Sequence, residues 1–193
     1  TTAAAARYSP HLEVFKKKGI EVLLLADRVD EWLVSSLTEF DGKSLQSVAK
    51  GSLDLGDLED KEEKEAVEKQ AEAHKDLLKK VQEVLGEGVK EVRVSHRLTD
   101  SPACLVVEDY DMSANLARVL KSVGQEAPDT KPIMEINMQH PLLSRLESED
   151  DEERFSDLTK VLFDQAQLAE GGQLDDPAAF VRRLNTLMLN LSA

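Results

Sequence analysis

The sequence predicts an α+β fold in which a small, incomplete α/β unit precedes a three-stranded sheet with helices and a C-terminal helical hairpin. Three observations predict it. Helix and strand patterns alternate over residues 9–50, three short strand patterns lie within residues 89–137, and two amphipathic helical patterns close the chain. Near residue 56 the composition becomes strongly charged, which divides the chain into predicted domains of residues 1–55 and 56–193.

The first unit is predicted from helix-capping residues and one apolar run. Ser9 is suited to cap a short helix that ends at Gly19. The run IEVLLL at residues 20–25 is typical of a strand buried on both faces, as in a parallel sheet. A second helix is expected over residues 27–37, and a DG turn leads into a strand over residues 43–50. The unit is incomplete because no strand precedes its first helix.

One long helix is predicted over residues 57–85. This stretch contains no proline or glycine and is rich in residues that favour helices. Opposite charges recur at helical spacing, as in Glu65 and Lys69. At 1.5 Å per residue the helix is roughly 40 Å long. Its charged first half is expected to be solvated, and its aliphatic second half is expected to pack against the rest of the domain.

Strands are predicted over residues 89–98, 102–109 and 131–137, and an amphipathic helix lies between the second and the third. The apolar stripe of that helix is formed by Met112, Leu116, Val119 and Leu120. An apolar stripe is covered either by the protein's own core or by a partner. By pattern alone, this stripe is more typical of a core helix.

Two further amphipathic helices are predicted at the C-terminus, after a short helix that begins at Pro141. Their apolar faces consist of Phe155, Leu158, Leu162 and Ala169 in the first and Phe180, Leu184, Leu187, Met188 and Leu191 in the second. This is more apolar surface than one hairpin can bury alone. We therefore expect two copies to pack as a four-helix bundle across a two-fold axis. The alternative is that the two helices cap the three-stranded sheet.

Composition excludes several partners and locations. The formal net charge of −14 argues against binding to nucleic acid and to anionic membranes, because both carry negative charge. No apolar run approaches the roughly 20 residues of a membrane span, and the N-terminus lacks the apolar region of a secretory signal. The single cysteine, Cys104, lies in an apolar run and is expected to be a small buried residue. A reducing, cytoplasmic location fits best.

Catalytic motifs are missing from the sequence. It contains no glycine-rich phosphate loop and no G-x-S-x-G motif, and its four histidines lack metal-ligand spacing. Asp27, Asp30 and Glu31 follow the predicted strand, where α/β enzymes often place catalytic groups. A role for Asp27 as a helix cap explains its position more simply. We therefore expect no catalytic residue and no metal site.

Four phrases carry a family resemblance. KKGIEVLLL, LTEFDGK, HRLTDSPA and DPAAFVRRLN, together with the segments around them, resemble the bacterial branch of the 90-kDa heat-shock chaperone family over nearly the whole chain. The resemblance identifies the chain as the end of a middle domain followed by a C-terminal dimerisation domain. It implies that the parent chaperone hydrolyses ATP with magnesium in parts that precede Thr1, so that this chain needs no cofactor.

The resemblance also implies two kinds of partner. The last two helices would form a homodimer, and unfolded client proteins would bind exposed apolar residues. By position, the client-binding residues are Trp32, Met112, Leu116, Val119 and Leu120. The resemblance thus favours partial exposure of the stripe over a core role. Two alternatives are a purely structural dimerisation module without client contact and a small α/β enzyme that uses Asp27 and its neighbours.

Overall fold

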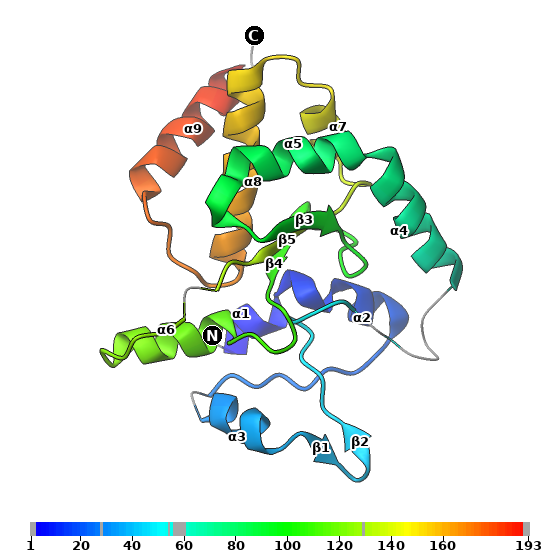
Figure 1. The fold of residues 1–193 in the computed structure, drawn as a ribbon, viewed down its shortest axis with the longest axis vertical. Coiled ribbons are helices and arrows are strands. Elements are labelled where there is room, and N and C mark those ends of the chain that lie inside the picture. The colour runs from blue at the N-terminus through cyan, green and yellow to red at the C-terminus, as the bar shows by residue number, and fades with distance from the viewer. Residues whose placement is uncertain (1–2, 28, 54, 56–60, 129, 191–193) are drawn as a thin grey trace.

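The computed structural model describes residues 3–190 except residues 28, 54, 56–60 and 129 (Figure 1). The N-terminal part consists of short helices and a small hairpin. Its elements are α1 (Ala3–Arg7), the 3-10 helix η1 (Pro10–Leu12), α2 (Glu13–Lys18), α3 (Asp30–Ser36), β1 (Glu39–Phe40) and β2 (Lys43–Ser44). As predicted, the Ser9 side chain caps η1 by accepting a hydrogen bond from the His11 N–H, and Gly19 ends α2 with a φ of 67°.

The predicted strand over residues 20–25 is wrong. These residues have no regular secondary structure, and Leu23 is 78% exposed. A strand buried on both faces needs neighbouring strands to pair its backbone groups. Among the described strands, β1 and β2 pair with each other and the remaining three form a separate sheet, so this run has no neighbour.

Two other predictions about the N-terminal part need correction. The strand expected over residues 43–50 shrinks to β2 and an isolated bridge between Lys50 and Val107. Asp27 does not cap α3. Its backbone N–H instead donates a 2.8 Å hydrogen bond to the carboxylate of Asp30, the first residue of that helix.

The predicted long helix is divided in two. Of the predicted range, residues 57–60 lie outside the described residues, and the rest forms α4 (Lys61–Ala73) and α5 (Lys75–Leu85), separated at His74. The aliphatic face of α5 packs against the sheet, whereas α4 runs off at an angle with mostly exposed side chains (Figure 1). Apolar packing is concentrated in α5, where Leu77 and Val81 are buried, whereas in α4 the residues that pack against the core are the partly buried Val67 and Ala71. The expected contrast between a solvated half and a packed half is confirmed.

The main sheet contains the three predicted strands. They are β3 (Glu91–Val94), β4 (Ala103–Val106) and β5 (Ile133–Ile136), in the order β3-β5-β4. β5 pairs parallel with β3 and antiparallel with β4, so that Met134 lies opposite Val92 and Leu105. All four residues of the central strand β5 are buried.

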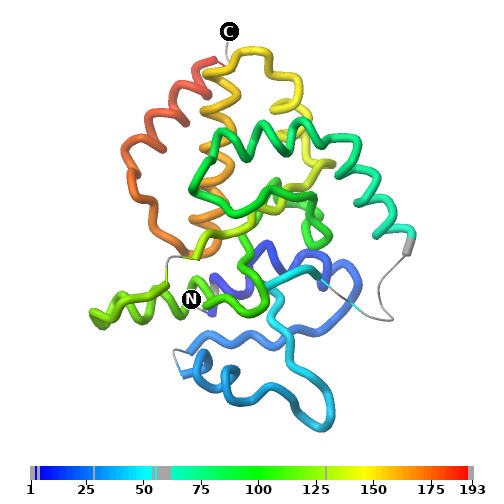
Figure 2. The backbone as a smooth tube through the Cα atoms, in the orientation of Figure 1, coloured from blue at the N-terminus to red at the C-terminus, as the bar shows by residue number. Residues whose placement is uncertain are grey.

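Helices α5 and α8 (Glu152–Ala169) pack against this sheet, and the path of the backbone between them can be followed in Figure 2. The remaining helices are α6 (Ala114–Ser122), between β4 and β5, and then α7 (Pro141–Glu147) and α9 (Pro177–Asn190). The predicted α+β class is confirmed, while the bundle of two copies stays a prediction. None of the helices in the described part of the chain combines the length and the apolar character needed to cross a bilayer.

Candidate functional site

The five residues expected to bind clients lie on two helices, or just before them, toward one end of the molecule, where α6 projects from its side (Figure 1). Trp32 is on α3 and is 52% exposed, and the four residues of the α6 stripe are each partly buried. No described residue of α6 belongs to either hydrophobic core cluster. The stripe is therefore not part of the core of the main sheet. We call Trp32 and the stripe, which is Met112, Leu116, Val119 and Leu120, the α3–α6 surface.

Glu31 joins the two helices of this surface. Its carboxylate accepts hydrogen bonds from the Ser113 hydroxyl at 2.8 Å and from the Asn115 amide at 2.6 Å. Ser113 is the N-cap of α6, and its hydroxyl oxygen also accepts the N–H of Leu116. A carboxylate at a helix N-terminus interacts favourably with the helix dipole. Glu31 thereby links α3, which carries Trp32, to the end of α6 where the stripe begins.

Arg118 holds α6 from the other side. Its guanidinium donates hydrogen bonds to the backbone carbonyls of Gly171 and of Glu170, the latter at 3.0 Å, where α8 ends. Arg118 lies about 200° around the helix from Leu116, because each residue turns an α-helix by roughly 100°. The anchor is therefore on the face opposite the stripe. This leaves the stripe directed away from the α8–α9 turn.

Further apolar side chains extend the exposed area around α3. Val29, Leu33, Val34 and Leu37 are all exposed, as is Val123 after α6. Large exposed apolar patches on protein surfaces often mark interaction sites, which makes the exposed apolar side chains of α3 candidates for one. The sequence analysis did not identify Glu31 and Arg118 as the residues that position α6. The capping role of Ser113 had a local sequence signal, whereas the other two act through contacts between distant segments.

The residues expected at the dimer interface fall into two groups. Phe155 and Leu162 are buried in the chain's own core, and the partly buried Leu158 packs against that core. Ala169 is exposed, and on α9 Phe180, Leu184 and Leu187 are partly buried, Met188 is 57% exposed, and Leu191 lies outside the described residues. The α8 residues thus serve mainly the fold of one chain, and the open apolar area lies on α9.

Helix α9 lies beside α8 and is linked to it by one arginine (Figure 2). Arg183 places its Nε 3.7 Å from Asp157 Oδ1 and its Nη1 3.4 Å from Asp164 Oδ2. Burial raises the pKa of Asp164, and the positive charge of Arg183 opposes that shift. The polar contact fixes one side of α9 to α8 and leaves Met188 and the exposed Val181 and Leu189 on the surface.

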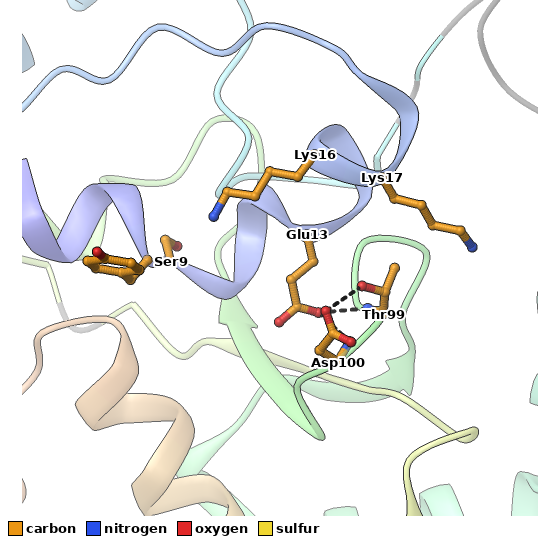
Figure 3. A pocket seen from close by; sticks show the side chains of 7 residues that line it. Ser9, Glu13, Lys16, Lys17, Thr99 and Asp100 are labelled. Atoms are coloured by element: carbon orange, nitrogen blue, oxygen red, sulfur yellow. Dashed lines mark hydrogen bonds between the residues drawn. The ribbon is translucent and has the colours of Figure 1, made fainter.

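A cleft of about 690 Å³ lies between α2 and the loop that precedes β4. Figure 3 shows Glu13 directed at Thr99 and Asp100, with Lys16 and Lys17 pointing away from it. The carboxylate accepts the backbone N–H groups of Thr99, Asp100 and Ser101 at 2.7–3.1 Å. Burial would raise the pKa of Glu13, but these hydrogen bonds and one from the Ser101 hydroxyl lower it. The carboxylate is thus fully engaged in holding the loop.

Two of the three carboxylates considered for the enzyme alternative, those of Asp30 and Glu31, have structural partners. Asp30 accepts the Asp27 N–H, and Glu31 binds α6. Within the described part of the chain, no three His, Cys, Asp or Glu side chains are grouped as a metal site. Cys104 is buried, and burial raises its pKa well above the usual value for a thiol, as expected for a packed rather than a reactive cysteine.

Comparison with known proteins gives one consistent result. The family model described as Hsp90 protein matches residues 1–192. The chain is 64% identical to the chaperone protein HtpG of Dechloromonas aromatica over 192 residues, which is 100% of this chain and 30% of the relative. It is 64% identical to the HtpG of Aromatoleum aromaticum over 96% of this chain and 28% of the relative, and 62% identical to that of Chromobacterium violaceum over 99% and 30%. The chain therefore spans about 30% of the length of these curated relatives.

Proposed function

This chain belongs to the Hsp90 family, and we propose that it serves a cytoplasmic, ATP-dependent chaperone by forming its homodimer and part of its surface for unfolded clients. One observation carries the client-binding part of the proposal. The apolar stripe of α6 lies outside both core clusters of the described residues, on a helix that Glu31 and Arg118 anchor by its polar groups.

The chemistry of the α3–α6 surface suits weak contact with many sequences. Its aliphatic side chains and one tryptophan present apolar area without buried charged groups that would demand a particular partner. Met112 adds a flexible, polarizable side chain that adapts to irregular surfaces. Each anchor residue should contribute only about 1 kcal/mol, since a chaperone must release its client as well as hold it.

The proposed dimer uses α9 together with the outer face of α8. Phe180, Leu184, Leu187 and Met188 would pack against their symmetry mates, and burial of each large apolar side chain contributes about 1.5–3 kcal/mol. A dimer would also present two α3–α6 surfaces to one client. Simultaneous contact with both would raise the effective affinity without any new kind of contact.

We assign nucleotide binding in the parent chaperone, with its ATP and magnesium, to parts outside this chain. The sequence offers no phosphate-binding loop, and the carboxylates of Asp30, Glu31 and Glu13 have structural partners. The net charge of −14 favours neither nucleic acid nor an anionic membrane as a partner.

The test is a binding measurement with reduced and carboxymethylated lactalbumin, which stays unfolded. The double variant Leu116→Ser/Leu120→Ser should bind it severalfold more weakly than the parent chain, with a nearly unchanged thermal midpoint. Lys121→Ser, an exposed substitution on the same helix, is the control and should bind like the parent.

Two outcomes would contradict the client-binding proposal. If the double variant binds the probe like the parent, the chain is a dimerisation module without client contact. If the double variant instead loses several kcal/mol of stability, the stripe is part of the core, because only buried residues cost so much when replaced.

A further inference from the structure

A buried cluster of charged side chains lies around Glu135 of the central strand of the main sheet, outside the α3–α6 surface. Arg97 is 0% exposed, and its Nε lies 2.8 Å from Oε2 of Glu135 in the central strand β5. Arg93 of β3 places its Nη2 2.7 Å from the other carboxylate oxygen, Oε1. The Ser95 hydroxyl adds a 2.9 Å hydrogen bond to Oε2. One carboxylate therefore faces two guanidinium groups, and guanidinium donors remain for other partners.

The remaining donors bind the backbone of residues 48–51, which we call the linker segment. Arg93 Nη2 and Arg97 Nη2 each donate to the Gly51 carbonyl at 2.8 Å, and Arg97 Nη1 donates to the Val48 carbonyl. The linker segment lies 46 and 49 residues before Arg97 in sequence. Because the acceptors are backbone carbonyls, the cluster fixes the course of the chain there rather than a particular side chain.

The other side of the linker segment is held by the residues that lead into α6. The Gly51 N–H donates to the Val107 carbonyl at 2.7 Å, and Lys50 Nζ donates to the Asp111 carbonyl at 2.6 Å, one residue before the stripe begins. Gly51 has a φ of 55°, and a Cβ there would meet the Asp109 carboxylate at 2.0 Å. The linker segment is thus closely fitted between the charged cluster and residues 107–111.

Stability alone does not account for such a cluster. Buried ion pairs are often no more stabilising than apolar side chains of similar volume, because removing their charges from water is costly. Their best-supported use is to specify one arrangement of the chain among several. Here that arrangement is the position of the linker segment, which follows α3 and β2 and touches the residues that precede α6 (Figure 1).

We propose that Arg97, with Arg93 and Glu135, is a positioning residue for the α3–α6 surface. By binding the carbonyls of Val48 and Gly51, the cluster fixes the linker segment. The linker segment in turn sets the position of α3 relative to α6. The predicted effect on client binding rests on the proposed function. The predicted effect on the distance between α3 and α6 does not depend on the proposed function.

The geometric part is tested by a distance measurement. Cysteines that carry spin labels are introduced at Ser36→Cys in α3 and Lys121→Cys in α6, both exposed positions, while the buried Cys104 stays unlabelled. Pulsed electron paramagnetic resonance should give one narrow distance distribution. Arg97→Lys keeps the charge but loses the planar fork, whereas Gly51→Ala disturbs the linker segment and leaves the charged side chains of the cluster unaltered. Both should shift or broaden the distribution.

Arg154→Lys is the matched control. It alters an arginine whose Nη2 lies 2.9 Å from Glu149 Oε1, away from the linker segment, and should leave the distribution unchanged. If Arg97→Lys and Gly51→Ala lower the thermal midpoint but keep the parent's distance, the cluster is merely structural and the proposal fails. If Arg97→Lys does not fold, Gly51→Ala decides the same question.

The functional part is tested with the unlabelled variants and carboxymethylated lactalbumin. Arg97→Lys and Gly51→Ala should bind it severalfold more weakly than the parent, although every apolar residue of the α3–α6 surface is intact. Parent-like binding by variants with an altered distance would overturn the positioning role. If the parent itself does not bind the probe, the proposed function fails, and the spin-label distances still decide whether the cluster positions α3.

Discussion

The carboxylate of Glu31 accepts a 2.8 Å hydrogen bond from the hydroxyl of Ser113, the residue that caps α6. The contact joins two segments 82 residues apart in sequence. It makes the position of α3 dependent on the start of α6, so that the two helices of the α3–α6 surface are held as one unit.

Glu31→Ala should therefore release α3 from α6. Hydrogen bonds to a charged group contribute about 1.5–3 kcal/mol, and we expect this partly exposed contact to lie at or below the lower end. Trp32 is the only tryptophan, so its emission reports on α3 directly. The emission should shift to longer wavelength and be quenched more readily by acrylamide. Glu21→Ala, at an exposed glutamate before α3, is the control, and an equal change there would contradict the docking role of Glu31.

Leu187→Asp should convert the proposed dimer into monomers. The substitution would bury two unpaired carboxylates in each dimer, which is costly in an apolar interface. Light scattering at micromolar concentration should give the mass of a dimer for the parent and of a monomer for the variant. Asn185→Asp adds the same charge at an exposed position of α9 and should stay dimeric. A monomeric parent would rule the interface out.

The stability of the chain should decrease in acid partly through Glu135. Burial alone would raise the pKa of Glu135, but the guanidinium groups of Arg97 and Arg93 hold it below its usual value near 4.5. A lowered folded-state pKa stabilises the fold above the unfolded-state pKa, and this contribution is lost as the pH falls through the folded-state value.

Urea unfolding measured between neutral pH and pH 3 tests this dependence. Glu135→Gln should be less stable than the parent at neutral pH, because it leaves two arginines without their carboxylate. Its stability should also fall less steeply below pH 4.5 than that of the parent. An equal or steeper fall in the variant would show that Glu135 does not contribute to the acid sensitivity.

The chain should bind no nucleotide on its own. Many nucleotide sites hold phosphate with the backbone N–H groups of a glycine-rich loop at a helix start, and the sequence has no such motif. Titration calorimetry with ATP and magnesium should therefore give no heat beyond dilution. A saturable isotherm at micromolar ATP would contradict the assignment of the nucleotide site to other parts of the chaperone.

Local signals were sufficient to predict most of the fold. Ser9 and Gly19 act as helix-end residues because capping depends on neighbouring backbone groups, and the three strands of the main sheet follow the apolar patterns. The strand at residues 20–25 failed because pairing depends on a second segment. The break at His74 was not predicted, because it depends on how α5 packs against the rest of the fold and not on a local sequence signal.

The candidate site was predictable only as a pattern. The stripe of α6 could be recognised from its spacing, but its partial exposure was favoured by family resemblance rather than by the spacing itself. Arg118 reaches carbonyls 52 and 53 residues further along the chain, and Arg97 reaches back 46 and 49 residues. Contacts over such separations leave no periodic signal in the sequence, so the residues that position α6 and the linker segment emerged only from the fold.

The strand order β3-β5-β4 also determines when the sheet can form during synthesis. The central strand, Ile133–Ile136, is the last of the three to leave the ribosome, and both edge strands pair with it. Until the central strand is synthesised, β4 has no strand with which to pair. Formation of the β3–β5 pair also closes a loop of about 40 residues that includes α6. A nascent chain that stops before Ile133 should therefore expose β4, and would itself resemble the unfolded proteins that chaperones bind.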